Sequence, residues 1–107
     1  MNQNDDCPIA TTLDVIGRKW KVHILCVLID GKMRTNEIRR EIPNITQKVL
    51  TQQLRQLEAD GIIHRIVYQE VPPKVEYTIS EYGKSLMQIM DELFEWGKDH
   101  QIKRLND

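Results

Sequence analysis

Five polar side chains recur at helical spacing in the middle of the chain, with no acidic residue among them. Amide and guanidinium groups can pair bidentately with adenine and guanine edges, and a threonine methyl can contact thymine. The spacing therefore predicts a helix surface that contacts bases in a major groove. An ordinary solvated helix surface is the alternative for each residue taken alone. The five are Gln47, Lys48, Thr51, Gln52 and Arg55.

The other side of the same segment is apolar. Leu50, Leu54 and Leu57 fall at positions i, i+4 and i+7, which is one stripe of a helix. Thr46 is a suitable N-cap and Gly61 a suitable stop. The pattern predicts a helix from about 46 to 60 whose leucines face the core.

A shorter helix is expected just before it, at about 35–41, with Ile38 and Ile42 as apolar anchors. The Pro43-Asn44 pair then makes a turn. The two helices predict a helix-turn-helix at about 35–60. Polar and basic residues surround the first helix and are expected to contact DNA phosphates, which fix register without reading sequence. They are Arg34, Thr35, Asn36, Arg39 and Arg40.

After Gly61 the pattern changes to period two, as in a β-hairpin at about 62–80. Pro72-Pro73 stiffens its loop, and Lys74 is expected at the tip, against the DNA backbone or an adjacent minor groove. Tyr77 should pack within the hairpin. Arg65 is expected to pair with Glu76 across the two strands.

Helices are also expected on both flanks: one from Pro8 to Gly17, one at about 20–29, and a final one at about 81–105. The final helix carries more apolar residues than one small core needs, which predicts a two-fold homodimer through it, with help from the first helix. Trp20 and Trp96 are expected to be packing anchors. The expected dimer residues are Leu86, Ile89, Met90, Leu93 and Phe94.

Charge is distributed unevenly. The whole chain carries a formal charge of -1, but residues 31–57 hold six basic and two acidic side chains. A basic face on an otherwise acidic body favours oriented contact with phosphates. Because a solvated helical surface would look similar, the charge supports a DNA partner only together with the predicted architecture.

At 107 residues the chain fits one domain, residues 1–107. The fold class is mainly α with a small β-hairpin (α+β), a winged helix-turn-helix. No apolar run is long enough for a membrane, and the first residues lack the features of a secretory signal, so we expect a cytoplasmic protein. We expect no cofactor and no metal, since the three histidines and two cysteines lack ligand spacing.

The two cysteines differ in setting. Cys7 precedes Pro8 at a helix start, where the helix dipole favours a thiolate while Asp5 and Asp6 oppose it. A redox sensor and an inert residue are therefore both open for Cys7. Cys26 stands between Leu25 and Val27, which predicts a core position.

A protein-interaction module and a small enzyme are two alternative functional classes. A winged helix that only binds proteins has no need for an acid-free polar surface, so Lys48, Gln52 and Arg55 argue against it. A small enzyme using the Cys7 thiol would need a nearby histidine, and none is close in sequence. We expect no catalytic site.

The sequence resembles the HxlR-type winged-helix transcriptional regulators, relatives of the MarR group. The resemblance covers nearly the whole chain and implies homodimers that bind operator DNA, usually to regulate nearby genes. Some members sense electrophiles or oxidants through a cysteine in an N-terminal Cys-Pro pair, where Cys7 stands here. Operator, effector and direction of regulation are not implied. The segments that carry this resemblance are CPIATTLDVIGRKWKVHIL, TNEIRREIPNITQKVLTQQLRQLEADGIIHR, VPPKVEYTISEYGKSL and DELFEWG.

Overall fold

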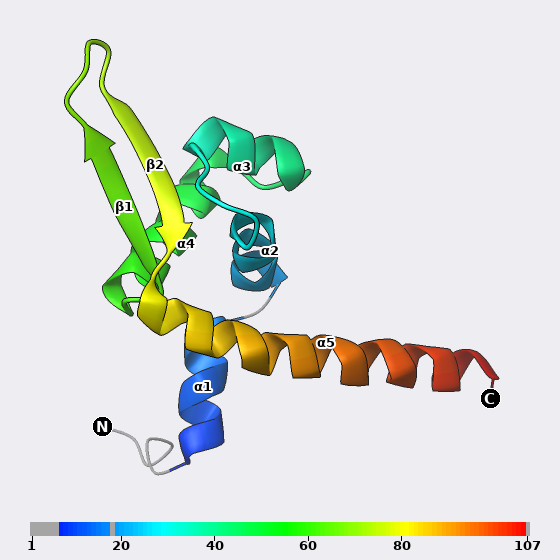
Figure 1. The fold of residues 1–107 in the computed structure, drawn as a ribbon. Helices are drawn as coiled ribbons and strands as arrows, with labels where there is room; N and C mark the ends of the chain where they lie inside the picture. Colours follow the sequence, from blue (N-terminus) through cyan, green and yellow to red (C-terminus); the bar gives the residue numbers. More distant parts are fainter. Residues whose placement is uncertain (1–6, 18, 107) are drawn as a thin grey trace.

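Five helices and one antiparallel hairpin make up the part of the chain that the computed structural model describes, residues 7–17 and 19–106 (Figure 1). This arrangement confirms the predicted fold class, mainly helical with a two-stranded wing. The elements are α1 (Pro8–Ile16), α2 (Lys19–Leu28), α3 (Thr35–Glu41), α4 (Gln47–Ala59), β1 (Ile63–Tyr68), β2 (Lys74–Ile79) and α5 (Glu81–Asn106).

The core forms where α4 packs against α2. Leu50, Leu54 and Leu57 are at most 1% exposed, so the predicted leucine stripe is buried. Ile24 and Leu25 of α2 are fully buried in the same cluster. Burying each such side chain contributes roughly 1.5–3 kcal/mol. These contacts fix which side of α4 is left for solvent.

Local signals set the ends of α3 and α4. The Glu37 carboxylate accepts a hydrogen bond from the Arg34 N–H at 2.7 Å, which satisfies a free donor at the start of α3. Asn44 makes the turn with φ of 76°, a conformation that asparagine tolerates better than most residues. The Thr46 hydroxyl accepts from the Val49 N–H at 3.1 Å, which confirms the predicted N-cap. At the other end of α4, Gly61 takes φ of 77°.

The wing is a hairpin in which β1 and β2 pair from Ile63↔Ile79 to Tyr68↔Lys74. Met33, between α2 and α3, adds a single antiparallel bridge to Tyr77. Its N–H and carbonyl bond to Tyr77 at 3.0 and 2.8 Å. This bridge, which the sequence did not predict, fastens the wing to the helix-turn-helix. Tyr77 is half-buried within the hairpin, as predicted.

Helix α5 starts against the core and then leaves the body (Figure 1). The Ser80 hydroxyl donates to the Gly61 carbonyl at 2.6 Å and accepts from the Gly83 N–H at 2.8 Å. Gly83 is buried beside the Ile62 carbonyl, where a Cβ would collide with the oxygen. The projecting half gives the molecule extents of 56 × 38 × 25 Å. None of the described helices combines the length and apolar content that crossing a membrane requires.

Three expectations about packing were wrong. Cys26 is exposed, because the buried stripe of α2 passes through Ile24, Leu25 and Leu28, and position 26 falls outside that stripe. Trp96 is 68% exposed on the projecting half of α5, where it stacks on His100 with 4.8 Å between ring centroids. Trp96 therefore packs against no core residue in the described part of the chain.

Leu86 was assigned to a dimer surface but belongs to the chain's own core, at 8% exposure. The first turns of α5 lie on the body, so their apolar residues are used there.

Candidate nucleic-acid interface

The predicted base-contacting residues lie together on the free side of α4. Lys48, Gln52 and Arg55 are exposed, and Thr51 is half-buried at the edge. They line an open hollow of about 540 Å³ that holds no acidic residue. Gln56 also lines it. Sequence reasoning missed Gln56, although its position four residues after Gln52 was a usable signal.

A hydrogen-bonded chain connects α3 to the start of this surface. Arg39 Nη1 donates to Gln47 Oε1 at 3.4 Å, and Gln47 Nε2 donates to Thr51 Oγ1 at 3.2 Å. Gln47 is therefore oriented from both sides before any ligand binds.

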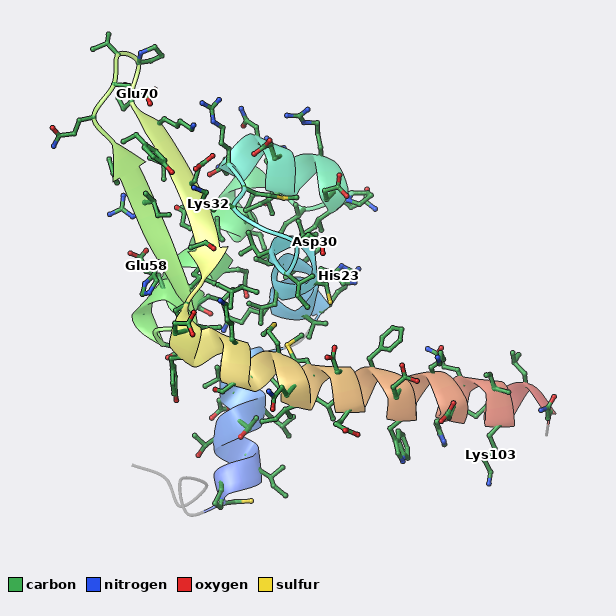
Figure 2. All side chains as sticks on the ribbon, in the orientation of Figure 1. His23, Asp30, Lys32, Glu58, Glu70 and Lys103 are labelled. Carbon is green, nitrogen blue, oxygen red and sulfur yellow. The ribbon has the colours of Figure 1, made fainter. Side chains whose placement is uncertain are left out.

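Basic side chains of α3 point away from the body toward solvent, as Figure 2 shows. Arg34, Arg39 and Arg40 are all exposed, and Asn36 lies with Arg39 and Arg40 along a second hollow of about 370 Å³. Thr35, at the start of α3, is half-buried. The predicted phosphate contacts thus form one surface beside the α4 hollow.

Lys74 does not lie at the tip of the wing. It is the first residue of β2, paired with Tyr68, and its ammonium lies 3.7 Å from a Glu76 carboxylate oxygen and 4.8 Å from the centre of the Tyr68 ring. The two prolines precede the strand, and the loop that joins β1 to β2 carries Glu70 (Figure 2). The loop of the wing therefore holds an acidic residue and not the cation that was expected at its tip.

The expected pair between Arg65 and Glu76 is absent from the described residues. In the hairpin register Arg65 lies opposite Tyr77 while Glu76 lies opposite Ile66, so the two side chains project from opposite faces. Arg65 instead approaches Glu58 of α4 at 3.7 Å between Nε and Oε2. This pair joins the wing to the end of α4.

Glu76 lies within a polar group on the other face of the wing. Its carboxylate accepts a hydrogen bond from the Tyr68 hydroxyl at 2.8 Å, and the same hydroxyl accepts from Lys32 Nζ at 3.4 Å. The Tyr68 hydrogen bond, followed by the nearby charges of Lys74, Lys32 and Arg34, lowers the pKa of Glu76 below its ordinary value. The carboxylate is therefore held ionised.

The two thiols have different surroundings. Cys7 is exposed and occupies the N-cap of α1 without a side-chain capping bond. Cys26 is exposed overall, but partial desolvation in the groove that it shares with Asp91, and then the charge of Asp91, raises the pKa of its thiol. Cys26 is thus a less favourable thiolate than an ordinary cysteine. The described residues contain no group of three or more His, Cys, Asp or Glu side chains placed to hold a metal ion.

Apolar surface remains on α5 and α1. Ile89, Leu93 and Phe94 are 47%, 51% and 64% exposed, and Ile9 and Leu13 of α1 are 71% and 55% exposed. Met90 is half-buried against the core. A groove of about 280 Å³ runs between α1, α2 and α5, lined among others by Ile16, Val22, Cys26, Met90, Leu93 and Phe94.

A helix-turn-helix followed by a hairpin, with a second helix whose solvent-facing hollow is polar and free of acidic residues, defines a winged helix-turn-helix protein. A family model described as HxlR-like helix-turn-helix matches residues 15–104, and the chain belongs to this family. The predicted resemblance is therefore confirmed.

Known relatives place the chain among transcriptional regulators. It is 64% identical over 92 residues to YtcD of Bacillus subtilis (strain 168), named an uncharacterized HTH-type transcriptional regulator, covering 86% of this chain and 73% of the relative. A crystal structure of a regulator named ytcD is similar with a TM-score of 0.84 and 62% identity, covering 88% of this chain and 96% of that one.

A second solved structure is titled redox regulator HypR in its oxidized form. It is similar with a TM-score of 0.81 and 57% identity, covering 87% of this chain and 96% of that chain.

Proposed function

We propose that the protein is a sequence-specific DNA-binding regulator that acts as a homodimer on operator DNA. The observation that carries this proposal is the exposed, acid-free surface of α4, held outward by a leucine stripe that is at most 1% exposed. Family membership supports it, since the relatives are named transcriptional regulators.

DNA binding uses two kinds of contact, one to bases and one to phosphates. Side chains on α4 reach base edges in the major groove and supply sequence preference. Residues around α3 and the wing bind phosphates and set the register of α4. The proposed base contacts are Gln47, Lys48, Thr51, Gln52 and Arg55, and the proposed backbone contacts are Arg34, Thr35, Asn36, Arg39, Arg40 and Lys74.

The second copy covers the apolar surface of α5 and α1. Ile89, Leu93 and Phe94 are exposed on α5, and Leu13 is exposed on α1, a helix that lies beside the first half of α5 (Figure 1). Exposed apolar surface of this kind is a common subunit interface. A two-fold axis there presents two α4 helices to one duplex, as a palindromic operator requires.

We propose that Cys7 makes the protein responsive to electrophiles or oxidants. Its thiol is exposed at the start of α1, the helix that borders the proposed dimer surface. The similarity to a structure titled as an oxidized redox regulator supports this role. Treatment with N-ethylmaleimide, which adds to a thiolate through a new S–C bond, is expected to release DNA from the wild type and not from Cys7→Ser. Release from both proteins would exclude Cys7 as the sensor.

Selection of bound genomic fragments, followed by anisotropy titration at several salt concentrations, tests DNA binding. Arg55→Gln is expected to weaken the selected site by about 1–3 kcal/mol and to relax sequence preference at one position. Lys103→Gln, at the far end of α5 (Figure 2), is the matched control and should bind as the wild type does. A protein-interaction module would select no fragment and show no steep salt dependence.

A further inference from the structure

Four side chains form a wing cluster that the predicted contacts do not explain: Lys32, Tyr68, Lys74 and Glu76. Tyr68 is central, because it donates to Glu76 at 2.8 Å, accepts from Lys32 at 3.4 Å and lies under the Lys74 ammonium. The Glu76 side chain is only 14% exposed and that of Lys74 29%. The carboxylate is therefore largely covered by its neighbours and faces the Lys74 ammonium.

An open groove of about 320 Å³ lies beside the wing cluster, between the start of α3 and the loop of the wing. Arg34 and Asn36 line one wall, and Glu70, Pro72, Pro73 and Lys74 of the wing line the other. Lys74 thus belongs both to the groove and to the wing cluster. A phosphate in this groove would meet a guanidinium on one side and an ammonium on the other.

We propose that Glu76 is a built-in counter-ion that neutralises Lys74 and Lys32 in the free protein, so that a DNA phosphate binds the groove only by displacing this carboxylate from Lys74. The inference rests on the proposed DNA-binding function. Lys32, which the sequence did not single out, then belongs to the DNA-facing surface.

The consequence is weaker general attraction to DNA. Each cation free to contact a phosphate releases counter-ions and adds about 0.9 to the slope of log K against log salt. A cation already paired contributes less, because the phosphate must replace an existing partner. Base contacts on α4 do not involve Glu76, so the carboxylate lowers the sequence-independent part of the affinity and leaves the sequence preference unchanged.

The test is a salt titration of binding to a short random-sequence duplex. Glu76→Gln keeps an acceptor for the Tyr68 hydroxyl and removes the charge. It should bind the duplex about three- to tenfold more tightly than the wild type at low salt. The slope of log K against log salt concentration should be steeper by about one. Glu41→Gln is the matched control, since it removes the same charge from the end of α3, and Glu41 is exposed, lies outside the groove and makes no ion pair within the described part of the chain. It should gain clearly less.

A second arm removes the cations. In a chain carrying Lys32→Gln and Lys74→Gln, adding Glu76→Gln should give no more gain in affinity than Glu41→Gln does. The proposal is overturned if Glu76→Gln binds no more tightly than Glu41→Gln, or if its extra gain in affinity persists without the two lysines. Wild-type protein that shows no salt-dependent binding would instead refute the proposed function itself.

Discussion

Arg39 of α3 donates a hydrogen bond from Nη1 to Oε1 of Gln47 at the first turn of α4, at 3.4 Å. The contact joins a residue that we propose binds phosphate to a residue that we propose contacts a base. We therefore expect Arg39 to have two separable roles, one through its charge and one through the orientation of Gln47.

Arg39→Gln should weaken binding to every duplex and lower the salt slope by about one. Because Gln47 also loses its partner, the sequence preference at the base that Gln47 contacts should broaden. Anisotropy titrations on the selected site and its single-base variants measure both effects. Arg40 is exposed on the same helix. Arg40→Gln should lower the salt slope by the same amount and leave the base preference unchanged. Equal broadening in the two variants would argue against an orienting role for Arg39.

Phe94→Glu should separate the two copies. It places a carboxylate without a partner in the proposed apolar interface, which costs at least about 3 kcal/mol, or more than a hundredfold in dimer affinity. Sedimentation should show monomers, with helix content unchanged because Phe94 is 64% exposed within one chain. Val67→Glu, on an exposed position of the wing, should remain dimeric. A Phe94→Glu dimer as tight as the wild type would place the interface elsewhere.

The two glycines of α5 should respond oppositely to alanine. Gly83→Ala places a Cβ against the Ile62 carbonyl oxygen, and relieving such overpacking costs typically about 1–3 kcal/mol. Gly97→Ala meets no atom within 4 Å and should gain up to about 1 kcal/mol from better helix propensity. Urea unfolding measures both. No destabilisation by Gly83→Ala would contradict the close packing at the start of α5, and destabilisation by Gly97→Ala would contradict the open surroundings of position 97.

Acid should weaken the fold partly through Glu76. Its pKa is lowered in the folded protein, chiefly by the Tyr68 hydrogen bond, so its stabilisation is present above the unfolded value of about 4.3 and is lost as the pH falls toward the folded value. Urea unfolding between pH 7 and pH 3 should show a steeper acid loss for the wild type than for Glu76→Gln. Tyr68→Phe should fall between them. Parallel curves for all three proteins would mean that this hydrogen bond does not favour the ionised carboxylate.

The sequence was most informative where one helix had two chemically distinct sides. The leucine stripe and capping residues of α4 determine which polar residues face solvent, so the candidate site was predictable. The partners of Lys74 and Arg65 were not, because strand register and loop length decide them, and a one-residue change exchanges the faces. Cys26 was misjudged because apolar neighbours in sequence do not report burial on a helix.

The fixed start of α5 has a geometric consequence. Ser80 and Gly83 hold the first turn of this helix against the end of α4, and 26 helical residues extend about 39 Å from there. If two copies join along α5, the angle between α5 and the body of each copy determines the separation and tilt of the paired α4 helices. The permitted distance between operator half-sites is then a property of this joint, and a few degrees of rocking there would bring the two halves of a palindrome into or out of reach.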